Sequence, residues 1–151
     1  MDRLQKPNSS PDCEEAERWY GRMRELYTTS PMHQYLGLSL DHVEDGSVVV
    51  GFAMNPQLNN ALGMIHGSIQ TAAMDSAILQ SVRTKCREGD HLVTVELKIN
   101  FLKAAIGPRF ECHANAVRVG GSIGVAEAKI VSPDGQVHAI GLGTISVKRK
   151  H

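Results

Sequence analysis

The chain has 151 residues, and its 16 basic and 16 acidic side chains balance to a formal net charge of zero. This length favours one domain with a substantial core, and the balanced charge argues against nucleic acid as a main partner. The sequence contains no apolar run of about 18 residues, so we expect no membrane-spanning helix and no membrane partner. The polar N-terminus, MDRLQKPNSSPDCEE, does not read as a signal peptide. Three scattered cysteines favour reduced thiols in the cytoplasm over a disulfide framework.

The first third of the chain predicts a tail, a helix and a hairpin. Residues 1–11 are polar with two prolines, which is typical of a flexible tail, and residues 12–151 are expected to form one domain. Residues 12–29 have the charge pattern of a helix capped by Asp12, with Trp19, Met23 and Leu26 as its apolar stripe. Alternating apolar residues over 36–41 and 48–54, around a turn at 44–46, predict a hairpin.

A helix that is apolar on nearly every face follows, from residue 65 to about 84. Its segment 65–82, IHGSIQTAAMDSAILQSV, contains one acidic side chain, Asp75. An all-apolar helix is normally buried, and a buried carboxylate is costly unless it is paired, neutralised or used. Asp75 is therefore either a catalytic residue or a structural one that bonds a neighbouring backbone group or an arginine. The helix begins at His66-Gly67-Ser68, where backbone N–H groups are free to bind a ligand.

The rest of the chain predicts four strands, at residues 93–101, 110–116, 123–131 and 137–147. In the first of them Val93, Val95, Leu97, Ile99 and Phe101 alternate with polar residues, which predicts one buried face. Short turns separate the last three strands, so these should be antiparallel neighbours. The expected fold class is α+β, with one curved antiparallel β-sheet wrapped around a long central helix. This arrangement is the hot-dog fold.

Residues 60–75, NALGMIHGSIQTAAMD, resemble the hot-dog-fold acyl-CoA thioesterases, in particular the phenylacetyl-CoA thioesterase-like branch. Members of that branch have an Asn, a Gly three residues later, a His-Gly-Gly motif, and an acid nine residues after the His. Here these places hold Asn60, Gly63, His66 with Gly67, and Asp75. The resemblance extends over roughly residues 36–147. Ser68 replaces the second Gly of the motif, and serine suits a helix start.

The resemblance implies a role for each of these residues. The N–H of Gly67 would polarise the thioester carbonyl, and Asp75 would act as a general base for water or as the nucleophile itself, two roles that the sequence does not separate. Asn60 would position water or the carbonyl, and Thr94 would orient water. His66 belongs to the motif, but we interpret it as a structural hydrogen-bonding residue rather than an acid or base. Further substrate contacts are expected from Gly63, Ser68, Gly121 and Ser122. In the family a basic residue frequently follows the glycine of the turn at 120–122, and this chain has Ser122 there instead.

Helix geometry adds a constraint on assembly. Gly67 and Asp75 are eight residues apart, which is about 12 Å along a helix axis, so one helix cannot present both to the same carbonyl. A site that uses both must be shared between two chains, as in the family's two-fold dimer, and we expect a homodimer or homotetramer with sites at the dimer interface.

The predicted function is hydrolysis of a small, medium or aromatic acyl-CoA to the free acid and CoA. No cofactor is expected, and no metal, since the histidines lack the spacing of metal ligands. The alternatives are a hot-dog module that binds acyl-CoA without hydrolysing it and, less favoured, a hydratase or dehydratase. Lys148, Arg149 and Lys150 are interpreted as a solvated tail that can also meet the phosphates of CoA.

Overall fold

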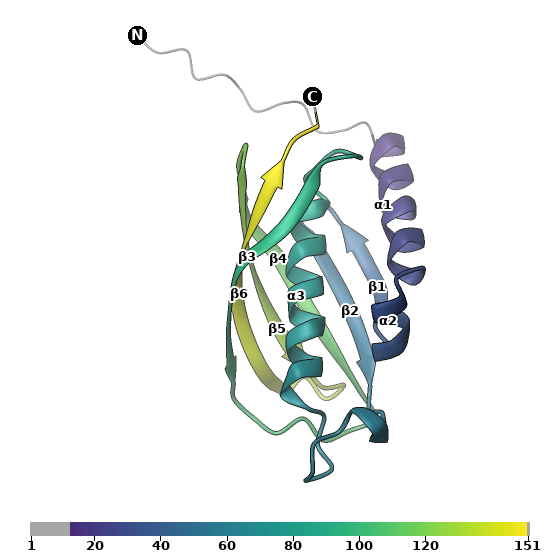
Figure 1. The fold of residues 1–151 in the computed structure, drawn as a ribbon, viewed down its shortest axis with the longest axis vertical. Coiled ribbons are helices and arrows are strands. Elements are labelled where there is room, and N and C mark those ends of the chain that lie inside the picture. The colour runs from purple at the N-terminus through teal and green to yellow at the C-terminus, as the bar shows by residue number, and fades with distance from the viewer. Residues whose placement is uncertain (1–12, 151) are drawn as a thin grey trace.

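The structure is a computed structural model that describes residues 13–150 (Figure 1). The helices are α1 (Cys13–Thr28), α2 (Pro31–Leu36) and α3 (Gly67–Arg83), with a short 3₁₀ turn at Pro56–Leu58. The strands are β1 (Ser39–Glu44), β2 (Ser47–Ala53), β3 (His91–Phe101), β4 (Arg109–Val119), β5 (Ile123–Val131) and β6 (Val137–Lys148). The predicted tail at 1–11 and the predicted cap Asp12 lie outside the described residues.

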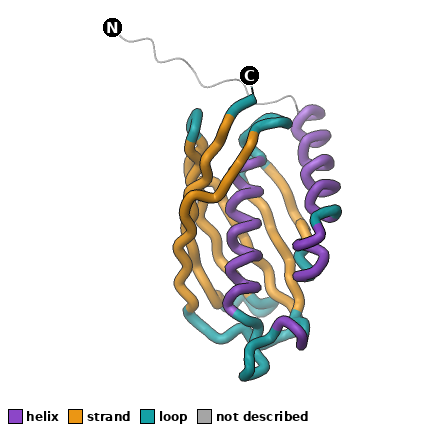
Figure 2. The backbone as a smooth tube through the Cα atoms, in the orientation of Figure 1, coloured by secondary structure: helices purple, strands orange, loops and turns teal. Residues whose placement is uncertain are grey.

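One antiparallel sheet carries the whole fold. Its strand order is β1-β2-β4-β5-β6-β3, and every neighbouring pair is antiparallel. The sheet curves around α3, while α1 runs beside β1 (Figure 2). The predicted α+β class and the central helix are therefore confirmed. No helix within residues 13–150 is long and apolar enough to cross a membrane.

The buried face of α3 packs into the sheet through residues spaced four apart. Met74, Ile78 and Val82 are fully buried, and each faces a glycine of the sheet where a side chain would clash. A Cβ at Gly124 would lie 2.5 Å from Val82, and one at Gly143 would lie 2.8 Å from Ile78. The glycines allow close approach of helix and sheet, because any larger residue would push α3 outward.

Gly143→Ala tests this contact. The added methyl group would overpack the helix–sheet interface, so we expect a loss of about 1–3 kcal/mol in the free energy of unfolding, measured by denaturant or thermal unfolding. Gly21→Ala is the matched control, because Gly21 lies inside α1 with no atom within 4 Å of the added Cβ. That change should raise stability by roughly 0.5–1 kcal/mol. Unchanged stability in Gly143→Ala would show that the close packing of α3 on Gly143 does not fix the position of the helix.

The N-terminal helices differ from the prediction in two ways. In α1 the buried residues are Tyr20, Met23 and Tyr27, whereas Leu26 of the predicted stripe is 47% exposed. The tyrosines bury their rings and lie on the same helical face as Met23. The six-residue α2 was not predicted at all, because the hairpin was expected to begin at Leu36. It is bounded by a Ser30 cap, by proline in its first turn and by Gly37 at φ 67°, a combination typical of a short helix.

The predicted buried face of β3 is confirmed for Leu97 and Ile99, which pack against the core, and is wrong for Val93, Val95 and Phe101, which are exposed. The pairing of β3 with β6 shifts between Thr94 and Glu96, which is a β-bulge, and a bulge exchanges the faces of the residues on its two sides. Val93 and Val95 are consequently more than 60% exposed, while Thr94 lies on the helix side and contacts α3. Since β3 is also one of the two edge strands of the sheet, its exposed apolar residues lie beside a backbone edge that pairs with no other strand among residues 13–150.

Candidate active site

The start of α3 is shaped by a histidine cap. His66 precedes the helix, and its Nδ1 accepts a hydrogen bond from the N–H of Ser68 at 3.1 Å and lies 2.7 Å from the Ser68 hydroxyl. Nδ1 is therefore the acceptor in this cap. Gly67 is the first helical residue, so its N–H has no intrahelical acceptor. This arrangement agrees with the structural interpretation of His66, and its catalytic role stays a prediction.

The loop before the helix is organised by Asn60. Its Oδ1 accepts hydrogen bonds from the backbone N–H groups of Leu62 (2.9 Å) and Met64 (3.1 Å). Gly63 allows the tight turn with φ 76°, a conformation that side chains rarely tolerate. Because Oδ1 is engaged in the loop, the Nδ2 group of Asn60 remains a hydrogen-bond donor for a ligand. The turn role and the site role predicted for Asn60 are thus compatible.

A pocket of about 330 Å³ brings Asn60 and Gly67 together. It lies between the start of α3 and the segment that follows β3, and both polar and apolar groups form its wall. A Cβ at Gly67 would lie 3.5 Å from the Phe101 ring, so the glycine leaves room between the ring and the helix terminus. The lining residues are Asn60, Met64, Ile65, Gly67, Gln70, Phe101, Leu102, Lys103, Ala104 and Ala105.

The segment after β3 is held by a residue that the sequence analysis did not select. His138 on β6 is 4% exposed, and its carbonyl oxygen accepts hydrogen bonds from the N–H groups of Leu102 (2.8 Å) and Lys103 (3.1 Å). Its Nδ1 lies 3.0 Å from the carbonyl oxygen of Ala104. Three consecutive pocket residues are therefore fixed by one histidine. A histidine inside a strand of alternating pattern gives no sequence signal for this role.

Asp75 is placed on the side of α3 that faces β3, away from the pocket lining. It is half-buried, and the hydroxyl of Thr94 donates a 2.7 Å hydrogen bond to its Oδ1. Within residues 13–150 no lysine or arginine pairs with this carboxylate. Thr94 thus contacts Asp75 directly, while its expected role of orienting water stays a prediction. Asp75 and Gly67 do not share a site within one chain.

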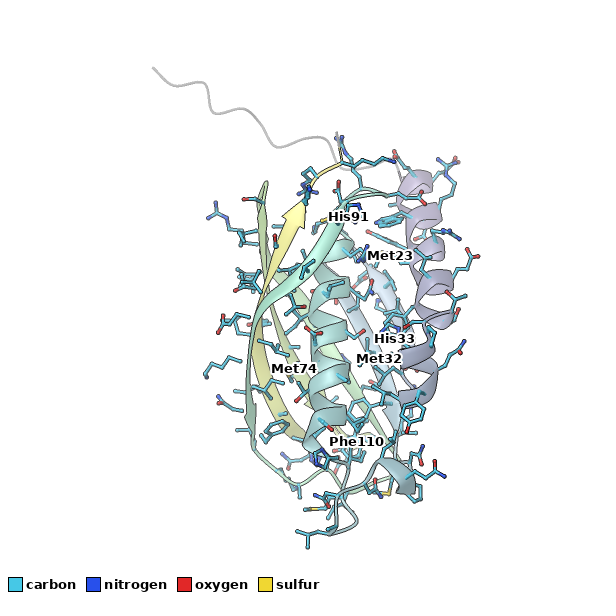
Figure 3. All side chains as sticks on the ribbon, in the orientation of Figure 1. Met23, Met32, His33, Met74, His91 and Phe110 are labelled. Atoms are coloured by element: carbon cyan, nitrogen blue, oxygen red, sulfur yellow. The ribbon has the colours of Figure 1, made fainter. Side chains whose placement is uncertain are left out.

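Gly121 and Ser122 lie in the β4–β5 turn, far from the pocket in the same chain. The backbone of Ser122 bonds β6 close to where β6 pairs with the start of β3, whereas Phe101, at the end of β3, lines the pocket. His91 and Phe110 mark these two ends of the molecule (Figure 3). Substrate contacts from Gly121 and Ser122 stay a prediction, and they would require a second chain or an extended ligand.

The basic C-terminal residues are partly built into the fold. Arg149 donates hydrogen bonds to the carboxylate of Asp90 at 2.8 Å and to the carbonyl oxygen of Gly120 at 2.9 Å, and the N–H of Lys150 donates to the same carboxylate. Asp90 is 5% exposed, so the pair is structural. The interpretation of 148–150 as a solvated tail is therefore wrong for Arg149, and it holds for the exposed side chains of Lys148 and Lys150.

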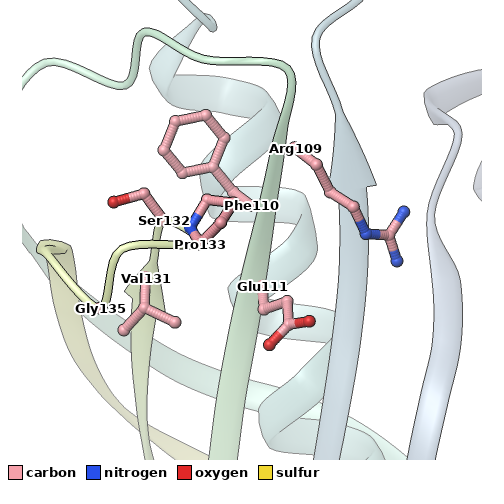
Figure 4. A pocket seen from close by; sticks show the side chains of 7 residues that line it. All are labelled: Arg109, Phe110, Glu111, Val131, Ser132, Pro133 and Gly135. Atoms are coloured by element: carbon pink, nitrogen blue, oxygen red, sulfur yellow. The ribbon is translucent and has the colours of Figure 1, made fainter.

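A second hollow, of about 400 Å³, lies near the β5–β6 turn and contains none of the predicted site residues (Figure 4). Its Arg109 points toward the neighbouring strands and forms an ion pair with Asp41. Ser132 bonds the Nε2 of His138 at 2.9 Å, which links this hollow to the wall of the first pocket. Within residues 13–150 no cluster of three or more His, Cys, Asp or Glu side chains is arranged to hold a metal ion.

Comparison with known proteins decides the family. Residues 62–139, which include Gly67, Asp75 and Thr94, match the thioesterase superfamily. The chain belongs to this superfamily. It is accordingly a thioester hydrolase with the hot-dog fold, and the predicted family and enzyme class are confirmed. The phenylacetyl-CoA thioesterase-like branch is a finer assignment that these matches support only loosely.

Individual proteins resemble the chain over most of its length. An esterase-like protein of Saccharolobus solfataricus is 29% identical over 130 residues, 85% of each chain. The 1,4-dihydroxy-2-naphthoyl-CoA hydrolase of Listeria monocytogenes is 23% identical over 119 residues, 79% of this chain and 97% of that one. The crystal structure of a thioesterase family protein from Silicibacter pomeroyi superimposes with a TM-score of 0.82 and 27% identity, covering 87% of this chain and 99% of the other.

Substitution of Gly67 tests whether this helix terminus acts on the thioester. A Gly67→Val side chain would crowd the Phe101 ring and obstruct the approach of a carbonyl to the N–H group. Loss of one such donor typically lowers turnover by on the order of 10²- to 10³-fold. Ser68→Gly is the matched control, because Ser68 is exposed, and it should retain most of the turnover.

Turnover and melting temperature of both Gly67→Val and Ser68→Gly should be measured together. A folded Gly67→Val protein with full turnover would eliminate the proposed donor role of Gly67. A large loss of stability with normal turnover of the folded fraction would assign Gly67 to packing alone. Loss of activity in Ser68→Gly would show instead that the serine takes part in the reaction.

Proposed function

We propose that the protein is an acyl-CoA thioesterase that uses the pocket at the start of α3 to hold the thioester. In the reaction, water adds an oxygen to the acyl carbon, the C–S bond breaks, and the sulfur leaves as the thiol of CoA. The N–H of Gly67 stabilises the negative charge that develops on the carbonyl oxygen, helped by the helix terminus and by the Nδ2 group of Asn60. The placement of Asn60 and Gly67 on one pocket carries the proposal.

Asp75 supplies the remaining chemistry in this proposal. As a general base it removes a proton from the attacking water, and as a nucleophile it forms an acyl anhydride that water then hydrolyses. Thr94 is a positioning residue, since its hydroxyl donates to one carboxylate oxygen and leaves the other free to accept from water. The carboxylate has no cationic partner among the described residues, so its charge is available for the reaction.

A second copy of the chain would bring Asp75 to the pocket. Antiparallel pairing of two β3 strands about their middle residue places Thr94 of one copy opposite Lys98 of the other. Lys98 is three residues from Phe101, or about 10 Å along a strand, whereas Thr94 and Phe101 of the same chain are about 23 Å apart. The exposed valines and free edge of β3 support such pairing. The proposed assembly is a homodimer, alone or paired into a homotetramer.

The size of the pocket supports a small, medium or aromatic acyl group. One relative is a hydrolase of an aromatic acyl-CoA, 1,4-dihydroxy-2-naphthoyl-CoA, and Phe101 and Met64 give this pocket an apolar wall. We place the enzyme in the cytoplasm, a proposal supported by the buried free thiols of Cys86 and Cys112.

Replacement of the acid tests the reaction. Asp75→Asn keeps the size of the side chain and should lower kcat by about 10²- to 10⁴-fold, measured as thiol release from a panel of acyl-CoA substrates. Asp45→Asn is the control, because Asp45 lies in the exposed β1–β2 turn and its ion pair with Lys85 is on the surface. Near-normal kcat in a folded Asp75→Asn protein would contradict the proposal. Saturable binding of acyl-CoA by the unmodified protein without thiol release would favour the non-catalytic binding module.

Mixed assemblies test whether the site is shared. Each dimer has two sites, and combining an Asp75→Asn chain with a Gly67→Val chain gives one site with both residues intact. Activity should therefore return when the two inactive proteins are mixed, up to about one quarter of the normal turnover per chain, because half of randomly mixed dimers are hybrids. Subunit exchange is verified by a size or affinity tag on one chain. Verified exchange with no recovered activity would rule out a site built from two chains.

A further inference from the structure

Gln70 is a buried polar residue of the pocket to which neither the motif nor the reaction assigns a role. It lies three residues after Gly67 on α3, is 5% exposed and lines the pocket with Asn60 and Gly67. Its Nε2 donates to the carbonyl oxygen of Ile65 at 3.5 Å. Its Oε1 is buried and has no hydrogen-bond partner among residues 13–150. A buried polar atom without a partner costs about 1–3 kcal/mol.

The neighbouring carbonyl fixes which atom of the amide is free. Reversal of the amide would place Oε1 against the Ile65 carbonyl oxygen, and two acceptors would then face each other. The atom left without a partner is therefore an acceptor, and it calls for a hydrogen-bond donor on the ligand. The 3.5 Å contact is long and the last torsion of glutamine is broad, so the amide can turn its oxygen toward a donor in the pocket.

The position of Gln70 relative to Gly67 indicates which part of the substrate it meets. Side chains of an α-helix lean toward its N-terminus, and the contact with Ile65 shows that this amide lies over the first turn. The thioester carbonyl held by Gly67 is therefore close by. The bulky CoA must leave the pocket toward solvent, so the acyl chain is the part that extends along Gln70, at the carbons next to the carbonyl.

We propose that Gln70 is a specificity-determining residue that accepts a hydrogen bond from a hydroxyl group on carbon 2 or 3 of the acyl chain. This inference rests on the proposed acyl-CoA thioesterase activity and narrows its substrate class to short hydroxyacyl thioesters. The remaining wall, with Phe101, Met64 and Ala105, suits the apolar part of such a group. An acyl group without the hydroxyl leaves Oε1 unpaired, and sites built to bond a hydroxyl discriminate strongly against substrates that lack it.

The test compares matched substrates that differ by one hydroxyl group. We would measure kcat/KM for 3-hydroxybutanoyl-CoA against butanoyl-CoA, and for 2-hydroxybutanoyl-CoA against butanoyl-CoA, with the unmodified enzyme and with Gln70→Leu and Gln70→Met. Gln80→Leu is the matched control, since Gln80 lies on the same helix, also has an unpaired buried Oε1 and does not line the pocket. Melting temperatures identify variants that fail to fold, and Gln70→Met preserves the shape of the side chain.

The unmodified enzyme should prefer one hydroxylated substrate by about 10-fold or more, as expected for about 1.4 kcal/mol of differential binding. In Gln70→Met and Gln70→Leu the ratio of the two kcat/KM values should fall toward one, because kcat/KM for butanoyl-CoA rises. Gln80→Leu should keep the preference of the unmodified enzyme. Equal rates on both substrates with the unmodified enzyme would overturn the inference, as would an equal loss on both in the Gln70 variants.

Binding of the same acyl-CoA pairs by calorimetry separates the two proposals. A preference for the hydroxylated ligand that disappears in Gln70→Met, without thiol release from any acyl-CoA, would sustain the role of Gln70 and end the proposed hydrolysis. Thiol release without a preference for the hydroxylated ligand would sustain the proposed hydrolysis and overturn the role of Gln70.

Discussion

The close approach of α3 to the sheet is the constraint on which the site depends. Met74, Ile78 and Val82 meet glycines of β5 and β6 instead of side chains, so the helix has one axial position in which its bulky residues fit. Shifting α3 by one residue would rotate these three side chains by about 100° away from the glycines. The helix start, and with it the N–H of Gly67, is consequently fixed against the end of β3 by contacts that lie two and more turns away.

Helix α3 combines two features that place opposite requirements on its burial, a free N-terminal turn and the carboxylate of Asp75. In the proposed mechanism its first turn presents the free N–H of Gly67 to the pocket, while its middle carries a carboxylate in an otherwise apolar sequence. The Asp75 carboxylate is not fully buried, because it lies on the half-buried face of α3, and it accepts a hydrogen bond from Thr94. The bulge in β3 makes this possible: it turns Thr94 toward the helix and the neighbouring valines outward. One irregularity thus supplies both the partner of the acid and the apolar edge available to a second chain.

The sequence predicted those parts of the fold that depend on long regular patterns. The central helix and the six strands have enough residues for their periods to be read. The spacing of Asn60, Gly67 and Asp75 suggested the candidate site residues, and their catalytic roles stay predictions. The sequence did not predict α2, because six residues are fewer than two helical turns and the cap residues were not recognised. It also assigned Val93 and Val95 to the core, since a bulge leaves the alternating pattern intact while exchanging its faces.

Residues that act through tertiary contacts were beyond sequence reasoning for a different reason. His138 fixes the wall of the pocket through its carbonyl group and its ring, and a backbone carbonyl has no sequence signature. Gln70 can be recognised in the sequence as a polar residue in an apolar helix. Its proposed role depends on which of its two amide atoms lacks a hydrogen-bond partner, and this is determined by the contact with the Ile65 carbonyl.

In the proposed dimer the environment of Asp75 changes on assembly. In one chain the carboxylate is half-buried and accessible to water. A second β3 strand would cover this side of the helix and remove part of that water, and electrostatic interactions strengthen as the surrounding dielectric falls. The same pairing would bring the carboxylate toward the pocket of the neighbouring chain. Dimerisation would then activate the acid and deliver it to the thioester in a single step, leaving a separate chain with a pocket but no base.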